Sequence, residues 1–118
     1  MNLIIRKAKI VDPQSPFHNQ TIDLKITEGI IEEIGASILN IDTHQEFQHE
    51  GLHLSQGWFD MSVSLGEPGF EDRETIANGL NVAAKSGFTG IALQPNSNPI
   101  IDNQSQVHFV KQKAANSA

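Results

Sequence analysis

An alternation of strand-like and helix-like segments over residues 57–118 constrains the fold of this chain more than any other feature. Residues 58–65, WFDMSVSL, and residues 88–96, FTGIALQPN, each read as a strand. Residues 72–87 carry apolar side chains at helical spacing, and residues 105–118 begin a second such pattern. Strands that alternate with helices predict a parallel sheet whose connections are right-handed crossovers.

The first of these helices has well-marked ends. Its apolar stripe, at positions i, i+4, i+7 and i+8, consists of Ile76, Leu80, Ala83 and Ala84. Asp72 is the expected N-cap, and Gly87 stands where a helix C-terminal glycine belongs. An acidic run precedes the helix and is expected to interact favourably with its dipole; it consists of Glu67, Glu71, Asp72 and Glu74. Because two parallel strands need neighbours and covering layers, we expect these residues to be the beginning, or a piece, of a larger α/β protein.

The chain before Gly57 reads as an all-β segment. Residues 22–26 alternate apolar and charged side chains, and the Glu28-Gly29 pair that follows predicts a tight turn into a second strand. The pattern changes at Gly57, so the sequence predicts two domains, residues 1–56 and residues 57–118.

Composition excludes several classes of partner and site. The chain has 118 residues, a net charge of −6 and only 8 Lys and Arg residues, which are scattered. Without a basic stripe, we expect neither nucleic acid nor a membrane as a partner. The absence of cysteine excludes disulfides and thiolate metal sites. No apolar run approaches the length of a membrane span or a signal-peptide core, so we expect a cytoplasmic protein.

The five histidines form no His-x-His pair. They are His18, His44, His49, His53 and His108. His49 and His53 are four residues apart, but Gly51 interrupts the β-like stretch between them, so a shared helical face is not expected. We expect the histidines to be exposed or to lie in turns.

Four short motifs follow one another around the two expected strands. They are Gly57 with Asp60, Glu67-Pro68-Gly69, Gly87-Phe88-Thr89 and Pro95-Asn96-Ser97-Asn98-Pro99. In this order and spacing, the chain resembles the start of the barrel in dihydroorotases, a family of the cyclic amidohydrolase superfamily. The resemblance implies an α/β fold: an N-terminal β-sandwich portion followed by the first two β-α units of a TIM-like (β/α)8 barrel, which takes about 250 residues.

The resemblance also places a metal site on the first barrel strand. In the family, Asp-Met is followed by His-x-His, which binds zinc, and an arginine that pairs with the substrate carboxylate follows two residues later. Residues i and i+2 of a strand point to one face, about 6.6 Å apart. Here Ser62 and Ser64 stand at the histidine positions and Gly66 at the arginine position. Because serine is a weak zinc ligand, we expect no catalytic residue, no metal and no cofactor to be retained in this segment.

The same alternation predicts to which face of the strand each neighbouring side chain points. Asp60 shares the face of the two serines, and the family's pattern makes it a structural residue. Met61, Val63 and Leu65 are expected to point the other way, into the helix layer. Asn96 follows the second strand, and the family's matching asparagine binds the substrate carboxylate. Asn96 is therefore the candidate substrate-binding residue, although Asn-Pro turn geometry also accounts for it.

Three hypotheses for function follow. The first is a dihydroorotase-like protein of pyrimidine biosynthesis that is catalytically inactive and acts as a scaffold. The resemblance implies aspartate carbamoyltransferase as its partner and an oligomer in the full-length form. The second is an active zinc-dependent cyclic amidohydrolase, which hydrolyses dihydroorotate to N-carbamoyl-aspartate with metal ligands beyond residue 118. The third is a standalone binding module whose exposed strand edges pair with a partner.

Overall fold

A computed structural model describes residues 1–115 of the chain. The chain divides into two compact units, Met1–Gln56 and Gly57–Ala118. The first unit contains β1 (Leu3–Ile10), β2 (Thr21–Thr27), β3 (Ile30–Gly35), β4 (Gln45–Gln48) and β5 (His53–Leu54). The second contains β6 (Trp58–Val63), α1 (Ile76–Lys85), β7 (Phe88–Leu93) and α2 (Gln104–Ala115). No helix within residues 1–115 is long and apolar enough to cross a membrane.

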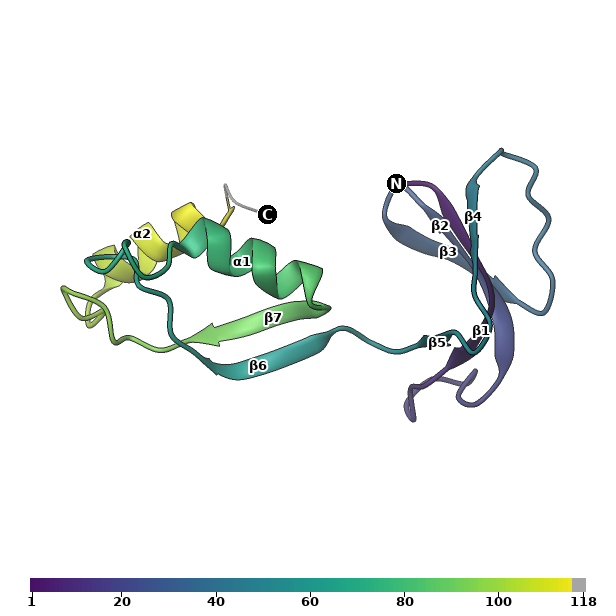
Figure 1. Ribbon diagram of the computed structural model, residues 1–118, viewed down its shortest axis with the longest axis horizontal. Helices are drawn as coiled ribbons and strands as arrows, with labels where there is room; N and C mark the ends of the chain where they lie inside the picture. The colour runs from purple at the N-terminus through teal and green to yellow at the C-terminus, as the bar shows by residue number, and fades with distance from the viewer. Residues whose placement is uncertain (116–118) are drawn as a thin grey trace. The chain divides into compact units, whose positions relative to one another are not determined.

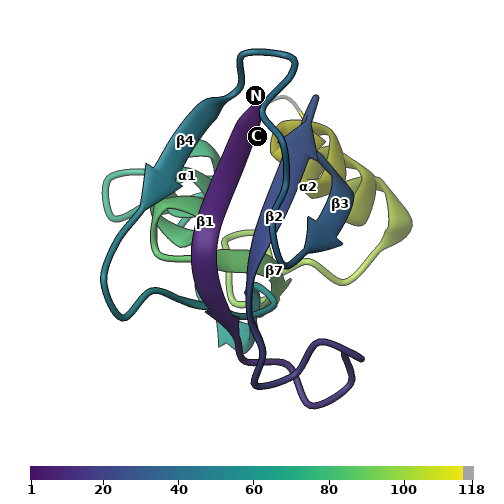
Figure 2. The same cartoon turned by 90° about the vertical axis from the view of Figure 1, so that its right-hand side faces the viewer.

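The first unit is one five-stranded sheet with β1 at its centre. The strand order is β3-β2-β1-β4 (Figure 2), and β5 pairs with β1 outside this order. β1 pairs antiparallel with β2 and parallel with β4 and β5. The buried apolar side chains of this unit come mainly from β1 and β2; they are Ile4, Ala8, Ile10, Ile22, Leu24 and Ile38.

The predicted hairpin is confirmed. β2 and β3 are antiparallel, and Thr27 pairs with Ile30 across the Glu28-Gly29 turn. Both turn residues have positive φ, 53° at Glu28 and 82° at Gly29, as the two-residue type I′ turn requires.

A buried ion pair fastens the loop after β3 to the centre of this sheet. The Arg6 guanidinium lies 2.7 Å from a carboxylate oxygen of Asp23 and also donates to the Ile38 carbonyl. Asp23 accepts two further hydrogen bonds, from the backbone N–H groups of Lys7 (2.9 Å) and Ile38 (3.3 Å). Burial alone would raise the pKa of Asp23. The hydrogen bonds from Lys7 and Arg6 outweigh burial and hold that pKa below its ordinary value of 3.8.

The second unit is a β-α-β-α segment, as the periodicity predicts. β6 and β7 are parallel neighbours, and both helices lie on one face of this pair (Figure 1). Leu65 and Ile76 are its buried apolar side chains. Trp58 and Phe88 pair at the start of the two strands, with ring centroids 6.4 Å apart.

The two ends of α1 differ in how well the sequence predicts them. Gly87 is confirmed as the C-terminal glycine, with φ of 88° and its N–H bonded to the Ala84 carbonyl at 3.1 Å. The N-cap prediction is wrong, because the cap is Thr75 and not Asp72. The Thr75 hydroxyl accepts from the Asn78 N–H at 3.2 Å. Residues 70–74 form a turn held by the Phe70 carbonyl, which delays the helix by three residues.

Removing the charge of Asp23 tests the role of the buried ion pair. The Asp23→Asn variant leaves the Arg6 cation without its buried partner, so we expect a loss of about 3 kcal/mol in the free energy of unfolding. Because the pKa of Asp23 is depressed, its stabilising effect is present above pH 3.8 and is lost as the pH falls below that value. Urea denaturation of the full chain across this pH range, followed by circular dichroism, measures both effects.

Glu46 provides the matched control, because its carboxylate accepts from the same guanidinium at 2.7 Å but is exposed. The Glu46→Gln variant is expected to cost less than about 1 kcal/mol. Equal losses in the two variants would show that burial of Asp23 has no special role.

Candidate functional site

The candidate site lies where β6 and β7 end. The two parallel strands finish side by side, with Val63 paired to Leu93 and the Gln94 N–H donating to the Val63 carbonyl at 2.8 Å. The loops that follow carry Ser64, at a predicted metal-ligand position, and Asn96, the predicted substrate-binding residue. Carboxyl ends of parallel strands are where α/β folds place their ligands.

Ser64 and Asn96 are in direct contact. The Asn96 side-chain amide donates to the Ser64 hydroxyl oxygen at 2.7 Å. The hydroxyl at this histidine position therefore already accepts a hydrogen bond from a neutral partner. Ser62 is held differently, because its backbone N–H donates to the Asp60 carboxylate at 2.9 Å.

An extra residue in β6 disturbs the strict alternation expected there. Asp60 pairs with Ile91 and Val63 with Leu93, so three steps along β6 oppose two along β7. The facing prediction is right for Val63 and Leu65, which line a cavity beneath α1. It is wrong for Met61, whose side chain is 77% exposed. Asp60 and Ser64, predicted on the opposite face, line the same cavity as Val63 and Leu65, so the predicted separation of the two faces is not observed at these positions.

Gly66 has no room for a side chain. A Cβ atom added there would lie 2.1 Å from the Phe70 carbonyl oxygen and 2.7 Å from that of Glu74. The Phe70 N–H also donates to the Gly66 carbonyl at 2.8 Å, which closes the turn. Backbone atoms therefore fill the space from which an arginine side chain at this position would extend.

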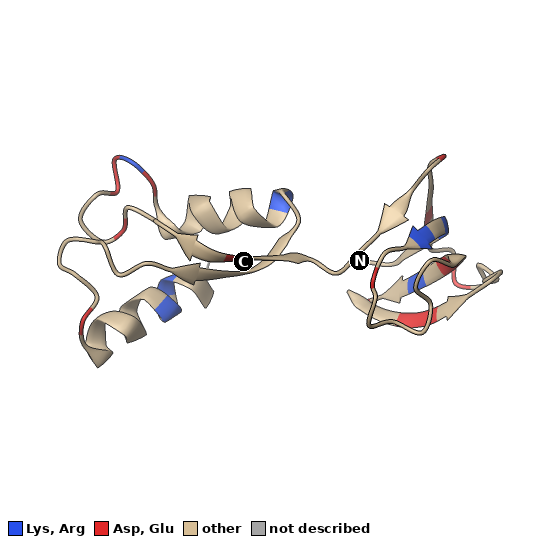
Figure 3. Cartoon of the chain, turned by 90° about the horizontal axis from the view of Figure 1, so that it is seen from below, with Lys and Arg blue, Asp and Glu red and all other residues tan. Residues whose placement is uncertain are grey.

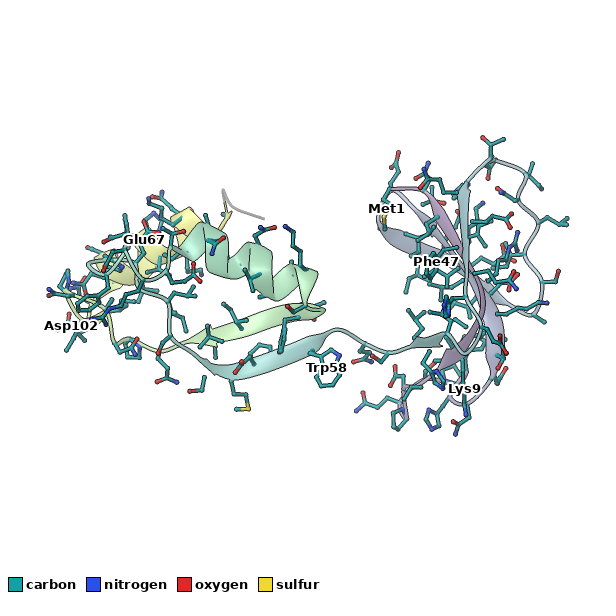
Figure 4. The ribbon with its side chains drawn as sticks, in the orientation of Figure 1. Met1, Lys9, Phe47, Trp58, Glu67 and Asp102 are labelled. Atoms are coloured by element: carbon teal, nitrogen blue, oxygen red, sulfur yellow. The ribbon has the colours of Figure 1, made fainter. Side chains whose placement is uncertain are left out.

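The buried carboxylate of Glu67 fixes this loop to both helices (Figure 4). One oxygen accepts from the Ile76 N–H at 3.1 Å, at the start of α1, and the other lies 2.8 Å from the Lys113 ammonium on α2. The ion pair with Lys113, helped by the Ile76 N–H, holds the pKa of Glu67 below its ordinary value. The structure therefore gives Glu67, in the acidic run, the expected favourable contact with the helix start.

The comparisons with known proteins agree with this architecture. The family model described as "Dihydro-orotase-like" matches residues 51–118. The chain belongs to the dihydroorotase-like family. The recognition drawn from the sequence motifs is confirmed, and with it the link of the family to pyrimidine biosynthesis.

Two relatives show the extent of the match. A dihydroorotase from Citrifermentans bemidjiense is 33% identical over 118 residues, which is all of this chain and 28% of the relative. A dihydroorotase from Ruminiclostridium cellulolyticum is 35% identical over 114 residues, 97% of this chain and 26% of the relative. The chain therefore spans about a quarter of the length of the relatives that it matches.

A solved structure confirms the fold. L-Hydantoinase (dihydropyrimidinase) from Arthrobacter aurescens matches 96% of this chain and 25% of its own, with a TM-score of 0.80 at 18% identity. This enzyme is a TIM-barrel amidohydrolase. The predicted fold class, a β-sandwich portion followed by two β-α units of an amidohydrolase barrel, is confirmed.

The residues at the rim of β6 do not fit the zinc ion that the family uses. Zinc in proteins is held by imidazole, thiolate or carboxylate groups, whereas Ser62 and Ser64 offer neutral hydroxyls. The Ser64 hydroxyl is also bonded to Asn96. Among residues 1–115, no three or more His, Asp or Glu side chains gather closely enough to hold a metal ion.

The histidines lie elsewhere, and one of them contradicts the sequence-based expectation. His49 and His53 are exposed and contact turn carbonyls, as expected. His44 is only 6% exposed, so the expectation is wrong for this residue. Asn40 bonds both backbone groups of His44 and folds its loop back, which places the imidazole 2.9 Å from the Thr27 hydroxyl.

The structure adds three residues that the sequence analysis did not place at the site. Phe70, Arg73 and Glu74 line a small cavity together with Ser64 and Asn96. No spacing rule indicates this proximity, because it depends on the turn over residues 66–74, whose path follows from backbone contacts at Gly66 and not from periodicity.

Replacing Gly66 tests the closed form of this loop. The Gly66→Ala variant forces a Cβ atom against two carbonyl oxygens, so we expect a loss of about 2 kcal/mol or more in stability. Faster hydrogen exchange over residues 66–76, measured by mass spectrometry, would locate the effect. Gly35→Ala is the control, because the nearest atom to its Cβ is 3.9 Å away. A Gly66→Ala variant with native stability and native hydrogen exchange would contradict the steric argument.

Proposed function

We propose that this chain belongs to a dihydroorotase homologue that lacks the zinc chemistry of its family and acts as a non-catalytic assembly subunit. The observation that carries the proposal is the contact between Ser64 and Asn96. This contact places two neutral groups at the strand rim, where the resemblance places zinc and the substrate carboxylate.

Gly66 supports the same conclusion from steric grounds. The resemblance assigns this position to an arginine that pairs with the substrate carboxylate, yet the Phe70 and Glu74 carbonyls exclude any side chain there. Three positions of one site have therefore changed together, while the Glu67 contacts that shape the loop are intact. A scaffold needs the fold but not the metal. These residues support a protein of that kind, with a retained loop structure and without zinc ligands at Ser62 and Ser64.

Metal content and turnover test the loss of chemistry. We expect full-length protein, purified without chelators, to contain far less than one zinc per chain and to show no hydrolysis of dihydroorotate. Elemental analysis and the loss of ultraviolet absorbance measure the two quantities, with a zinc-containing dihydroorotase as the positive control. Stoichiometric zinc together with turnover would overturn the proposal and favour an active hydrolase.

Replacing both serines by histidine tests whether positions 62 and 64 are the metal-ligand positions. The Ser62→His, Ser64→His double variant is expected to bind zinc more tightly than the native protein, because the resemblance places the zinc-binding imidazoles of the family at these two positions, and imidazole is a far better zinc ligand than a serine hydroxyl. Isothermal titration with zinc measures the gain. The Ser62→Ala, Ser64→Ala double variant is the control, and equal zinc affinity in both would contradict the assignment of these positions.

The assembly role has its own test. We propose aspartate carbamoyltransferase from the same organism as the partner, supported by the resemblance to a family whose members assemble with that enzyme. Light scattering after size exclusion of the mixed full-length proteins is expected to give a mass above that of either alone. Two unshifted peaks at micromolar concentrations would count against this partner.

A further inference from the structure

The imidazole of His44 is buried in the first unit, and one of its two nitrogens has no partner. Its Nε2 lies 2.9 Å from the Thr27 hydroxyl on β2. Its Nδ1 is shielded from solvent and makes no hydrogen bond; within residues 1–115 it is the one buried side-chain nitrogen or oxygen without a partner. Unpaired buried polar atoms are rare in folded proteins, because they lose their hydrogen bonds to water and gain none in return.

The neighbours of the imidazole fix which nitrogen carries the proton. A carboxylate only accepts hydrogen bonds, so the Thr27 hydroxyl donates its proton to Glu32. The Thr27 oxygen is then the acceptor for His44, and Nε2 is the nitrogen that bears the N–H. A neutral imidazole has one N–H, so Nδ1 is left with an unpaired electron-pair acceptor. The geometry therefore holds His44 as the neutral Nε2–H tautomer.

Charged side chains surround this imidazole, in a unit where acidic and basic residues are interspersed (Figure 3). Lys25 of β2 lies 2.8 Å from the carboxylate of Asp42, in the same loop as His44, and 3.2 Å from that of Glu32 on β3. The other charged groups near the loop are Glu46 of β4, which shares the Asn40 amide with the His44 carbonyl, and Met1 and Glu28, which border a cavity with Thr43 and Gln45. None of these groups bonds Nδ1, so a proton added there meets no protein acceptor.

Few contacts keep residues 39–44 closed against the sheet. The Asn40 side-chain oxygen accepts from the His44 N–H at 2.8 Å, and its amide donates to the His44 carbonyl at 2.9 Å. The apolar side chains on either side of Asn40, Leu39 and Ile41, are 74% and 79% exposed, so their burial does not hold the segment. Segments with little buried apolar surface open at a low cost in free energy. Contacts of His44 therefore decide whether this segment stays closed.

We propose that His44 is a pH-sensitive switch: protonation of Nδ1 in mildly acidic solution releases residues 39–44 from the sheet. The added N–H is a buried donor without an acceptor, and the imidazole binds the proton more favourably once it reaches water. A solvent-exposed imidazole takes up a proton near pH 6.5, a value of about 6.5 being typical of the free side chain. The open form binds more protons than the closed form, so opening is favoured as the pH falls.

The carboxylates beside His44 act in a lower pH range. The hydrogen bond from Lys25 holds the pKa of Asp42 below its ordinary value of 3.8, and the bonds from Thr27 and Lys25 hold the pKa of Glu32 below 4.5. Depressed pKa values give stability that is present above those ordinary values and is lost as the pH falls below them. Between pH 7.5 and 5.5 these carboxylates stay ionised, so the effect of His44 can be measured separately from theirs.

Hydrogen exchange of the full-length protein tests the switch. Protection factors, which are corrected for the intrinsic pH dependence of exchange, are expected to fall about tenfold for residues 39–44 between pH 7.5 and 5.5. The Ile38 N–H donates to Asp23 at 3.3 Å and lies outside the released segment, so it is the internal reference and should keep its protection. Unchanged protection of residues 39–44 over this range would overturn the proposal.

A variant without a titratable group assigns the effect to His44. His44→Gln keeps an N–H donor for Thr27, so protection of residues 39–44 is expected to become independent of pH between 7.5 and 5.5. His53→Gln is the matched control, because His53 is exposed and bonds the Gly51 carbonyl; it should keep the native pH dependence. A pH dependence of native size in folded His44→Gln would refute the role of His44.

The tautomer can be read in the native protein, which requires no variant to fold. Nitrogen NMR of full-length protein with ¹⁵N-labelled histidine is expected to show His44, assigned by its nuclear Overhauser contact with Thr27, as the Nε2–H form at pH 7.5. An Nδ1–H form or an imidazolium at that pH would overturn the proposal. Both measurements are independent of zinc content and of assembly, so they stand or fall separately from the proposed function.

Discussion

The buried carboxylate of Glu67 is the interaction on which the second unit depends. It is only 8% exposed, and it joins three segments: its own loop, the first N–H of α1 and Lys113 of α2. A buried charge is costly unless partners satisfy it, so this residue specifies where the loop and both helices meet. The loop that carries the Gly66 turn and Arg73 is thereby joined to both helices.

The anchored loop also explains why the departures from the family motif belong together. Once residues 67–74 fold back onto the end of β6, the carbonyls of Phe70 and Glu74 approach position 66 so closely that only glycine fits. The same turn brings Arg73 to the rim. The absence of a side chain at Gly66 and the position of Arg73 beside Ser64 therefore both depend on this one backbone path.

Periodicity and turn chemistry were enough to predict most of the fold. The β2-β3 hairpin, the parallel β6-β7 pair, both helices and the glycine end of α1 follow from local patterns that the tertiary structure does not override. The predictions that were wrong failed for physical reasons that local patterns do not contain. An extra residue in β6 exposes Met61, the turn at Phe70 moves the N-cap to Thr75, and Asn40 folds the loop that buries His44. The grouping of Arg73 and Glu74 with Ser64 depends on the same turn, so the sequence could predict only Ser64 and Asn96, which follow soon after the two strands.

At the rim where β6 and β7 end, a hydrogen bond between two neutral side chains links the strand ends, as a shared cation does in a zinc site. A metal ion bound by residues of neighbouring strands holds the strand ends together through its ligands. Here the Asn96 amide reaches from the end of β7 to the Ser64 hydroxyl at the end of β6. The Asn98 N–H adds a second link, because it donates to the Pro68 carbonyl of the other loop at 2.9 Å. Both links are satisfied without an ion, so the barrel units keep their geometry when the imidazoles are absent. The proposed loss of zinc chemistry is therefore compatible with a retained fold.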